Sequence, residues 1–307
     1  MRLSELFDKG FVSYLRVEKG SQERTITAYE SNFADFNDFS KRRTRTAVVL
    51  AGFTADLVRA YLHDLASRQL QPNTIRQRLA TLSSFARWLV SHGKLPKNPI
   101  DELVRPKKRT RLPVVPKWEA VEDLVRKTED RRDKALLALL SWGGLRREEV
   151  VSLDVGDFDP TFGLRRVLGK GGHEATVPLP EVARKIVAEY LATERKGAGP
   201  EEPLFIVRYY TLGRKVEIRR MLSDRLYKLV RVLGEANGMP RLHPHAFRHS
   251  CGVELLRRTG GNLRAVQQHL RHTDIQTTTI YTQMAPEELQ QAVKLFDKPK
   301  GDWVAKG

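Results

Sequence analysis

Residues 242–281 read LHPHAFRHSCGVELLRRTGGNLRAVQQHLRHTDIQTTTIY, and this stretch decides what fold and chemistry we expect of the second half of the chain. It places His245, Arg248, His272 and Tyr281 in one short span. Residues three apart on a helix share a face, so we expect His245 and Arg248 to point the same way. Imidazoles, a guanidinium and a phenol are groups that can hold a phosphodiester and attack it.

The apolar spacing of this stretch predicts two helices. The first is anchored to a core by a stripe formed by Phe247, Cys251 and Leu255. Gly260-Gly261 breaks the chain, and Asn262 is the expected N-cap of a second helix from Leu263 to about His269. His272 falls just past this helix, so we expect its side chain to be placed by a turn.

Two further motifs lie upstream. Gly144-Leu145-Arg146 is followed three residues later by Glu149. Lys170 lies in Gly169-Lys170-Gly171-Gly172, between two short strand-like stretches at 164–168 and 174–179, which is typical of a hairpin. A Walker phosphate-binding loop is excluded, because the pattern is not GxxxxGK[ST].

In their order along residues 144–281, these motifs resemble the signature of the tyrosine recombinases, also called the lambda-integrase family, and most of all its Xer branch. The matching pieces are Gly-Leu-Arg at 144–146 with Glu149, Lys170, His-x-x-Arg at 245–248, Leu-x-His-x-Asp at 270–274 and Thr-x-x-Tyr at 278–281. The chain departs from the family at Arg271, because the family usually has Gly between the Leu and the His. A residue with a Cβ constrains the turn that places His272.

Arg146 and Arg248 are the residues that we expect to clamp the non-bridging oxygens of a DNA phosphodiester, because a guanidinium keeps its charge at any workable pH. His245 and His272 would donate further hydrogen bonds, and the resemblance also gives His245 a proton-transfer role. Tyr281 is the expected nucleophile.

Lys170 is the candidate general acid that protonates the leaving 5′-oxygen. Glu149 would support the site by orienting Arg146 or a histidine. The product of the attack is a 3′-phosphotyrosyl link that stores the energy of the broken bond. Ligation therefore needs no ATP and cleavage needs no metal, so no cofactor is expected.

Less specific interpretations stand beside these roles. Tyr281 is alternatively a core tyrosine, and Lys170 a turn lysine. The additional histidines His243, His249 and His269 raise the question of a zinc site. No cysteine pairs with them and their spacing fits no standard zinc motif, so we expect them to be structural or to face DNA.

The composition favours a polyanionic partner. The chain has 307 residues and a formal net charge of +17, which is typical of nucleic-acid-binding proteins and also of ribosome-like or merely soluble basic proteins. The single cysteine, Cys251, excludes an intrachain disulfide and fits a reducing compartment. No run is long enough to span a membrane, and the N-terminus lacks the apolar region of a signal peptide, so we expect a cytoplasmic protein without membrane contact.

The chain is long enough for two domains with separate cores. Residues 1–104 read as a helical core-binding (DNA-binding) domain, residues 105–113 as a basic, proline-containing linker, and residues 114–307 as a mixed α/β catalytic domain. The expected fold class is therefore mainly α with a small antiparallel β-sheet. The resemblance implies that the two domains clamp opposite faces of a duplex.

The N-terminal domain is expected to contribute DNA contacts from its fourth helix. That helix begins near Asn73, and the face opposite its apolar stripe presents Arg76, Gln77, Arg78 and Arg87. Ser21 is the expected N-cap of the second helix, and the third helix is expected to start at Thr54. In the linker, the candidate phosphate contacts are Arg105, Lys107, Lys108, Arg109 and Arg111. For any one of these residues, a solvated surface role remains an alternative.

In the catalytic domain, the patterns predict helices at 118–127, 131–141, 147–153 and 180–196. Residues 204–219 read as two further strands, an extra hairpin relative to the Xer pattern, with no assigned role. The tail is expected to form a helix at 286–297 whose apolar stripe needs a groove. It either packs on its own domain or, as the resemblance implies, docks into a neighbouring copy.

The expected function is that of a site-specific recombinase, which exchanges strands between two duplexes through a Holliday junction in a four-subunit synapse. The partner is a double-stranded DNA recombination site, and the synapse contains copies of this chain alone or together with a related recombinase. An integrase or transposase of a mobile element with the same chemistry is the alternative within this class. A non-catalytic DNA-binding protein on the same scaffold is the alternative outside it.

Overall fold

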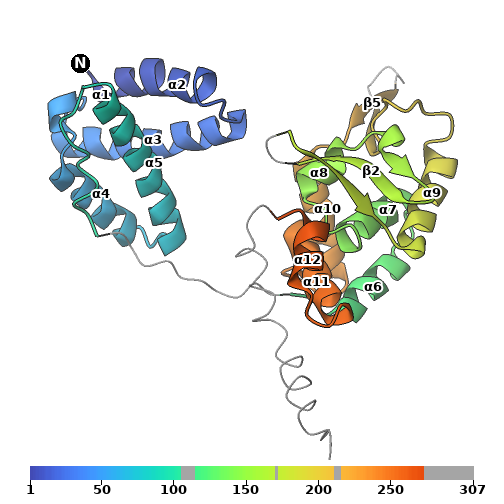
Figure 1. Ribbon diagram of the computed structural model, residues 1–307. Helices are drawn as coiled ribbons and strands as arrows, with labels where there is room; N and C mark the ends of the chain where they lie inside the picture. The colour runs from blue at the N-terminus through green and yellow to red at the C-terminus, as the bar shows by residue number, and fades with distance from the viewer. Residues whose placement is uncertain (105–114, 170–171, 211–215, 273–307) are drawn as a thin grey trace, which may run out of the picture. The chain divides into compact units, whose positions relative to one another are not determined.

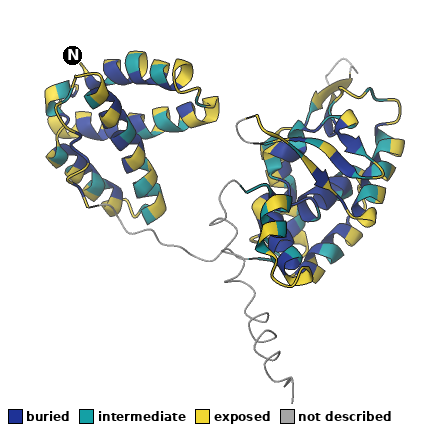
Figure 2. Ribbon diagram, viewed as in Figure 1, coloured by how far each residue is buried: buried dark blue, intermediate teal, exposed yellow. Residues whose placement is uncertain are grey.

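The computed structural model describes residues 1–104, 115–169, 172–210 and 216–272. The chain divides into two compact units, residues 1–111 and 112–307, and each unit has its own apolar core (Figure 1). Figure 2 shows that buried residues occupy the inward faces of the helices in both units. The fold is mainly helical with small antiparallel sheets, as the sequence predicts.

The N-terminal unit is helical throughout its regular structure. Its elements are α1 (Leu3–Glu5), the π-helical turn η1 (Leu6–Phe11), α2 (Val12–Val17), α3 (Glu23–Thr44), the short 3₁₀ turn η2 (Leu50–Gly52), α4 (Ala55–Ser67) and α5 (Pro72–Ser91). The third helix was predicted to start at Thr54, and Thr54 is the N-cap of α4: its side chain accepts a bond from the backbone N–H of Leu57 at 3.3 Å. The prediction for Ser21 was wrong by one residue: Gln22 is the N-cap of α3, and it makes no side-chain capping bond.

Aromatic side chains hold these helices together. Phe7 stacks on Phe33 with ring centroids 3.8 Å apart, and Phe85 meets both rings edge-on. Gly10 lets the first helical segment approach α5, because a Cβ at this position would lie 2.4 Å from an atom of the Trp88 ring. The core of this unit is therefore set by interlocking rings, which bury large apolar areas.

The C-terminal unit combines helices with two antiparallel sheets. Its helical elements are α6 (Trp118–Lys127), α7 (Arg131–Ser141), α8 (Arg147–Ser152), the short 3₁₀ turn η3 (Val155–Asp157), α9 (Glu181–Glu194), α10 (Ser223–Ala236), α11 (Pro244–Arg258) and α12 (Leu263–Leu270). Its strands are β1 (Phe158–Asp159), β2 (Gly163–Leu168), β3 (Glu174–Pro178), β4 (Ile206–Tyr210) and β5 (Val216–Arg220). The patterns predicted α6 and α7 with these bounds, but α10 and β1 were not anticipated.

The two sheets have orders β1-β2-β3 and β4-β5. In the first, Leu164 pairs with Val177 and Leu168 with Glu174, and the register shifts between residues 164 and 167. In the second, Ile206 pairs with Arg220 and Tyr210 with Val216, which confirms the extra hairpin. Among the described residues, no helix is both long enough and apolar enough to cross a membrane.

Candidate active site

The candidate active site lies around a tight turn just before α8. Gly144 has φ +54°, a conformation that residues with a Cβ rarely adopt. A Cβ here would also lie 2.5 Å from Cδ2 of Leu270 and 3.2 Å from Sγ of Cys251. The turn therefore packs directly against α11 and α12, and this close approach brings the motif at 144–146 beside residues more than a hundred positions later in the chain.

Arg146 occupies the N-cap position of α8 and is held by Glu149. The backbone N–H of Arg146 donates to Oε2 of Glu149 at 2.9 Å, and its Nη1 donates to Oε1 at 2.6 Å. The Glu149 side chain is only 4% exposed, whereas that of Arg146 is 36% exposed. Glu149 thus fixes the guanidinium from the protein side and leaves its other side open to a ligand, which is the supporting role that the sequence suggests.

Glu149 has a lowered pKa despite its burial. Burial alone would raise the pKa of this carboxyl, but the positive charge of Arg271 and the hydrogen bonds from Arg146 outweigh it. The group therefore stays ionised at neutral pH. An ionised, buried carboxylate between two guanidiniums gives the site a fixed geometry.

Arg248 is the second guanidinium that the sequence predicts to clamp a phosphodiester, and protein groups surround it. Its side chain is fully buried. Nη1 donates to the backbone oxygen of Gly144 at 2.5 Å, and Nη2 donates to the backbone oxygen of Leu270. Arg248 therefore ties the turn before α8 to the end of α12. Because it is buried, direct contact with a phosphate would require the atoms that cover it to move.

His245 and Arg248 lie one turn apart on α11, and His272 follows the end of α12. The pKa of His272 is lowered to about 3 by burial, by the charge of Arg248 and by that of Arg146. The pKa of His245 is also lowered, by burial first and then by Arg248. Both rings are therefore neutral at pH 7, and each can donate one hydrogen bond.

We call Arg146, Glu149, His245, Arg248 and His272 the central site. These five residues come from three separate stretches of sequence, and the fold brings them together. Two other predicted members, Lys170 and Tyr281, lie outside the described residues. The tail at 286–297 and the linker candidates Arg105, Lys107, Lys108, Arg109 and Arg111 also lie outside them.

The remaining histidines and the cysteine have structural roles or surround the central site. His243 caps α11 by accepting a bond from the N–H of Ala246 at 3.2 Å, and His269 contacts the backbone oxygen of Trp142 at 2.8 Å. His249 packs edge-on against His245, with ring centroids 4.6 Å apart. Cys251 is buried, and burial raises its pKa to about 12, so its thiol is inert. In the part of the chain that the structure describes, no group of three or more ligating side chains could hold a metal ion.

The predicted DNA contacts of α5 divide into two kinds. Gln77 and Arg87 are exposed, and Arg76 is half-buried. Arg78 does not share their open face. It pairs with Asp35 of α3, which also binds Arg68, the residue directly after α4, at 3.0 Å. Arg78 thus joins three helices, because its position borders the buried stripe, and this contact competes with binding to DNA.

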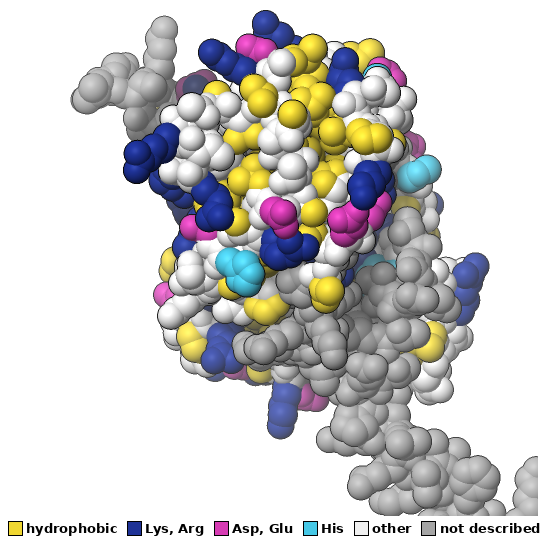
Figure 3. All heavy atoms as spheres, turned by 90° about the vertical axis from the view of Figure 1, so that its left-hand side faces the viewer, with side chains coloured by type: hydrophobic (Ala, Val, Ile, Leu, Met, Phe, Trp, Pro, Cys, Tyr) yellow, Lys and Arg dark blue, Asp and Glu magenta, His cyan; other side chains and the backbone are white. Residues whose placement is uncertain are grey.

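The positive charge of the protein is not spread evenly. On the face shown in Figure 3, hydrophobic side chains gather in the upper part, whereas Lys and Arg lie mainly around the border, interspersed with Asp and Glu. The described residues visible on this face therefore form no continuous basic patch. A polyanion would bind where cations converge, so clusters of arginine are more informative than the net charge.

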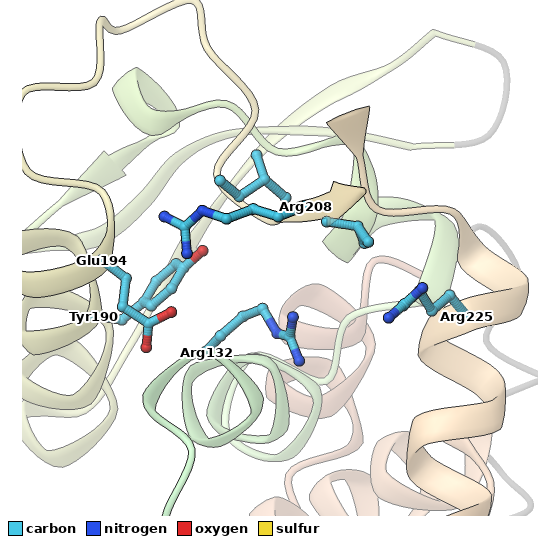
Figure 4. A pocket seen from close by; sticks show the side chains of 7 residues that line it. Arg132, Tyr190, Glu194, Arg208 and Arg225 are labelled. Atoms are coloured by element: carbon cyan, nitrogen blue, oxygen red, sulfur yellow. The ribbon is translucent and has the colours of Figure 1, made fainter. Parts of the chain in front are cut away.

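One such cluster was missed in the sequence. A cavity of about 190 Å³ in the C-terminal unit is lined by Arg132, Tyr190, Glu194, Ile206, Val207, Arg208 and Arg225, and we call it the β4 pocket (Figure 4). Arg132 and Arg208 reach into it from opposite sides, and Arg225 points toward it from α10. Arg208 is on the 204–219 hairpin, which was predicted without a role, and Arg225 is on α10, which was not predicted. The sequence could therefore have indicated this pocket only if both elements had been predicted and placed side by side.

The arginines of the β4 pocket are neutralised to different degrees. Arg132 forms ion pairs with Asp133 at 2.7 Å and with Asp130 at 4.0 Å. Within residues 1–104, 115–169, 172–210 and 216–272, no carboxylate forms an ion pair with Arg208 or Arg225. Glu194 is the one acid that lines the cavity. The pocket therefore has the charge and the size to hold one phosphate group.

Comparison with known proteins identifies the class that this fold and site define. The model of the phage integrase family matches residues 118–288, and the model of the phage integrase N-terminal SAM-like domain matches residues 9–93. The chain belongs to the phage integrase family, whose members are the tyrosine recombinases, and the resemblance inferred from the motifs is confirmed.

Individual relatives place it near the Xer branch. The chain is 31% identical over 291 residues to tyrosine recombinase XerC of Corynebacterium efficiens, covering 92% of this chain and 88% of that protein. It is also 31% identical over 302 residues to tyrosine recombinase XerC of Xylella fastidiosa, with 96% of each covered. The chain is accordingly an Xer-like tyrosine recombinase, an enzyme that cleaves and rejoins DNA.

Solved structures share the fold. The XerH recombinase bound to palindromic difH matches with a TM-score of 0.69 at 17% identity, covering 91% of this chain and 82% of that one. A lambda integrase tetramer bound to a Holliday junction matches with a TM-score of 0.66 at 14% identity, covering 92% and 77%. At these identities the similarity establishes the architecture, and the roles of single residues must be argued from the site itself.

Proposed function

We propose that the central site binds one phosphodiester of a DNA recombination site and that Tyr281 attacks its phosphorus. The attack forms a 3′-phosphotyrosyl link and releases a 5′-hydroxyl. The observation that carries this proposal is the convergence of two guanidiniums and two neutral imidazoles around the turn at Gly144. An anion is the ligand that such a group of donors recognises.

Arg146 is proposed to make the direct contact with a non-bridging oxygen, because Glu149 orients its guanidinium while 36% of the side chain stays exposed. His245 and His272 each offer one neutral N–H donor. Donors that are already in place cost no reorganisation as negative charge builds on the phosphorane, and losing one such donor typically costs about 100- to 1,000-fold in rate.

Arg248 is proposed to supply positive charge and to hold the site together. A guanidinium has five N–H groups. Two of them hold the oxygens of Gly144 and Leu270, which fixes the positions of the Arg146 turn and the His272 turn. The charge of Arg248 adds to the positive potential at the phosphate. Arg248 would also bond directly to the phosphate if bound DNA displaces the atoms that bury its side chain.

Tyr281 and Lys170 complete the proposed reaction. A phenol has a pKa near 10, so the cationic surroundings or a neighbouring base must help it to lose its proton. The leaving 5′-oxygen takes a proton from Lys170. In the reverse direction a 5′-hydroxyl attacks the phosphotyrosine, and strand exchange follows when that hydroxyl comes from the other duplex.

Assembly and setting are proposed to follow those of Xer recombinases. Four copies, or two copies with two of a related recombinase, would act on paired double-stranded DNA sites in the cytoplasm. The tetramer of lambda integrase on a Holliday junction supports this arrangement. An apolar groove of about 340 Å³, lined mainly by Trp118, Trp142, Val182 and Leu255, suits the apolar face of a tail helix from the same or a neighbouring copy. Separation of joined chromosomes and integration of a mobile element are both uses of this chemistry.

A nicked duplex tests the proposed chemistry. The half-site sequence in this duplex is first identified by selecting, from random duplexes, those that the wild-type protein binds. The nick then lets the cleaved fragment diffuse away, so that the covalent adduct accumulates. Wild-type protein should accumulate as a covalent adduct on the 3′-phosphate, with or without EDTA. Tyr281→Phe should bind the same duplex and form no adduct. Because this variant leaves the DNA uncleaved, its complexes with two duplexes can be weighed by native mass spectrometry, and they should contain four protomers. An adduct that persists in Tyr281→Phe would refute the assignment of the nucleophile.

A further inference from the structure

The residue at the end of α12 has a costly backbone conformation. Arg271 has φ 55° and ψ 45°, the left-handed region that favours glycine. Among the described residues, only two other non-glycine residues have positive φ, Arg45 and Gln69. Arg45 and Gln69 are exposed, whereas the Arg271 side chain is 11% exposed. Strain at a buried arginine calls for a contact that only its side chain can make.

The side chain of Arg271 turns back toward α8. Its Nη2 donates to Oε2 of Glu149 at 2.9 Å, and its Nη1 donates to the backbone oxygen of His269 at 2.6 Å. Glu149 is 4% exposed, so this ion pair is well shielded from water. A buried, charge-assisted pair with a second bond on the other nitrogen has a defined geometry.

Arg271 and Arg146 therefore share one carboxylate. Oε1 of Glu149 accepts from Nη1 of Arg146, while Oε2 accepts from the backbone N–H of Arg146 and from Nη2 of Arg271. Two positive charges on one negative charge leave the cluster with a net positive charge. Arg146 is thus oriented by Glu149 without being fully neutralised by it.

The same residue also sets the path of the chain into His272. The left-handed turn at Arg271 ends α12, and the N–H of His272 then donates to the oxygen of Gln267 at 3.1 Å. The side-chain amide of Gln267 donates in turn to the oxygen of His272 at 3.2 Å. A single residue therefore joins the carboxylate behind Arg146 to the turn that carries His272.

We propose that Arg271 is a positioning residue of the recombination reaction, which acts through Glu149 to hold Arg146 and His272 in register while keeping the phosphate site cationic. The proposal rests on the function proposed above for the central site. It concerns the position at which this chain departs from the glycine usual in the family, and it assigns that departure to catalysis.

The electrostatics of Glu149 supply a specific signature. Against the effect of burial, the charge of Arg271 is the largest influence that lowers the pKa of Glu149. Without Arg271 that pKa rises, so the carboxyl takes up its proton at a higher pH and releases Arg146. Cleavage should then fail on the acid side at a higher pH than in the wild-type protein.

Arg271→Gly is the decisive variant, because glycine relieves the backbone strain while it removes the side chain. On the nicked duplex described above, Arg271→Gly should bind the half-site within about twofold of wild type, since the residue is buried. Its cleavage rate should fall by about 10- to 100-fold, as is typical for partners that orient a primary ligand. The acid limb of its rate-against-pH profile should move to higher pH.

Two controls accompany it. Arg271→Lys keeps the charge but not the two-pronged geometry, so it should recover the wild-type acid limb and part of the rate. Lys196→Ala removes an exposed cation elsewhere in the same unit, just after α9, and should behave as wild type. An Arg271→Gly protein with the wild-type rate and acid limb would overturn the proposal, as would a lowered rate with an unmoved acid limb.

If Arg271→Gly melts below the assay temperature, Glu149→Gln decides the question. Because Arg271 acts through Glu149, Glu149→Gln and the double variant Glu149→Gln/Arg271→Lys should cleave at the same rate, and additive losses would refute the proposal. The outcomes separate the two levels of inference. A wild-type protein without any adduct contradicts the proposed function, whereas a normal wild type with an unaffected Arg271→Gly contradicts only the role of Arg271.

Discussion

Two clusters of arginines in the C-terminal unit are held in opposite ways. In the central site, Arg248 is fully buried on two backbone oxygens and Arg146 is oriented by a buried carboxylate. In the β4 pocket, Arg208 and Arg225 reach toward an open cavity and form no ion pair with a carboxylate of the described residues. The first cluster consists of cations fixed before any ligand arrives, and the second of cations that remain adjustable.

This difference matches two tasks of a DNA-processing enzyme. Stabilising a transition state requires donors whose positions do not change as charge develops, so the structure must hold them with its own polar groups. Holding a duplex requires only that positive charge lie near phosphates, where the gain comes largely from released counterions. The predictions that follow test whether this division between a rigid and an adjustable cluster is correct.

Arg248→Ala should have the largest effect. It leaves the oxygens of Gly144 and Leu270 without their buried donor, so the free energy of unfolding should fall by about 3 kcal/mol. Cleavage should fall by about 1,000-fold or more, because the two turns lose their link and the site loses a charge. Urea unfolding and the rate of adduct formation measure the two effects.

Arg208→Ala is the matched change in the β4 pocket. It should leave the unfolding transition within error of wild type, since no described carboxylate depends on it for an ion pair. If Arg208→Ala destabilises the protein as much as Arg248→Ala does, the β4 pocket is structural and the comparison fails.

The next prediction concerns the pH dependence of stability, which should come from the histidines around the central site. The pKa values of His272 and His249 are lowered to about 3 and about 4, by burial first and then by nearby positive charges. In the unfolded chain a histidine takes up its proton near pH 6.5. The unfolded state therefore binds more protons between about pH 6.5 and 4, and the free energy of unfolding should fall as the pH is lowered through this window.

A bound phosphate counteracts the lowering of the histidine pKa values, because its negative charge raises them. DNA binding should therefore be accompanied by proton uptake near pH 5.5, which is measurable by calorimetry in buffers of different ionisation enthalpy. His272→Gln should reduce the uptake, and His63→Gln, at an exposed position on α4, should not. Equal uptake in the wild type and His272→Gln would show that the phosphate does not bind beside this ring.

The smallest effect is expected from the adjustable cluster itself. The double variant Arg208→Ala/Arg225→Ala should weaken DNA binding at all sequences and reduce the slope of log K against log salt by about 1, because the pocket holds one phosphate group. The cleavage rate at saturating protein should not change. Lys185→Ala/Lys196→Ala removes the same charge elsewhere, on and just after α9, and controls for the net charge. An unchanged slope would exclude the β4 pocket from the DNA interface.

Much of this site could be predicted from local sequence. The spacing of His245 and Arg248 fixed them on one helical face, and the capping residue Asn262 fixed the start of α12. The motif Gly144-Leu145-Arg146 with Glu149 marked the start of α8, where the structure places Arg146 against Glu149. These features depend on contacts between residues close in sequence, so the periodicity of the chain is enough to reveal them.

The rest required the tertiary structure. Sequence reasoning did not show that Arg248 is buried against the oxygens of Gly144 and Leu270, because both partners are distant in the sequence. It also placed Arg78 on an open face, whereas Asp35 draws this arginine into the joint between three helices.

By itself, the sequence determined which residue types this protein offers to DNA, in what order, and on which helices and strands most of them lie. Only the tertiary structure decided which guanidiniums are buried and which stay open, and that the unusual Arg271 reaches Glu149 from 122 positions away. The physical reason is that burial and ion pairing depend on long-range packing. The field and the solvation that a charge experiences are set by whatever the fold places around it.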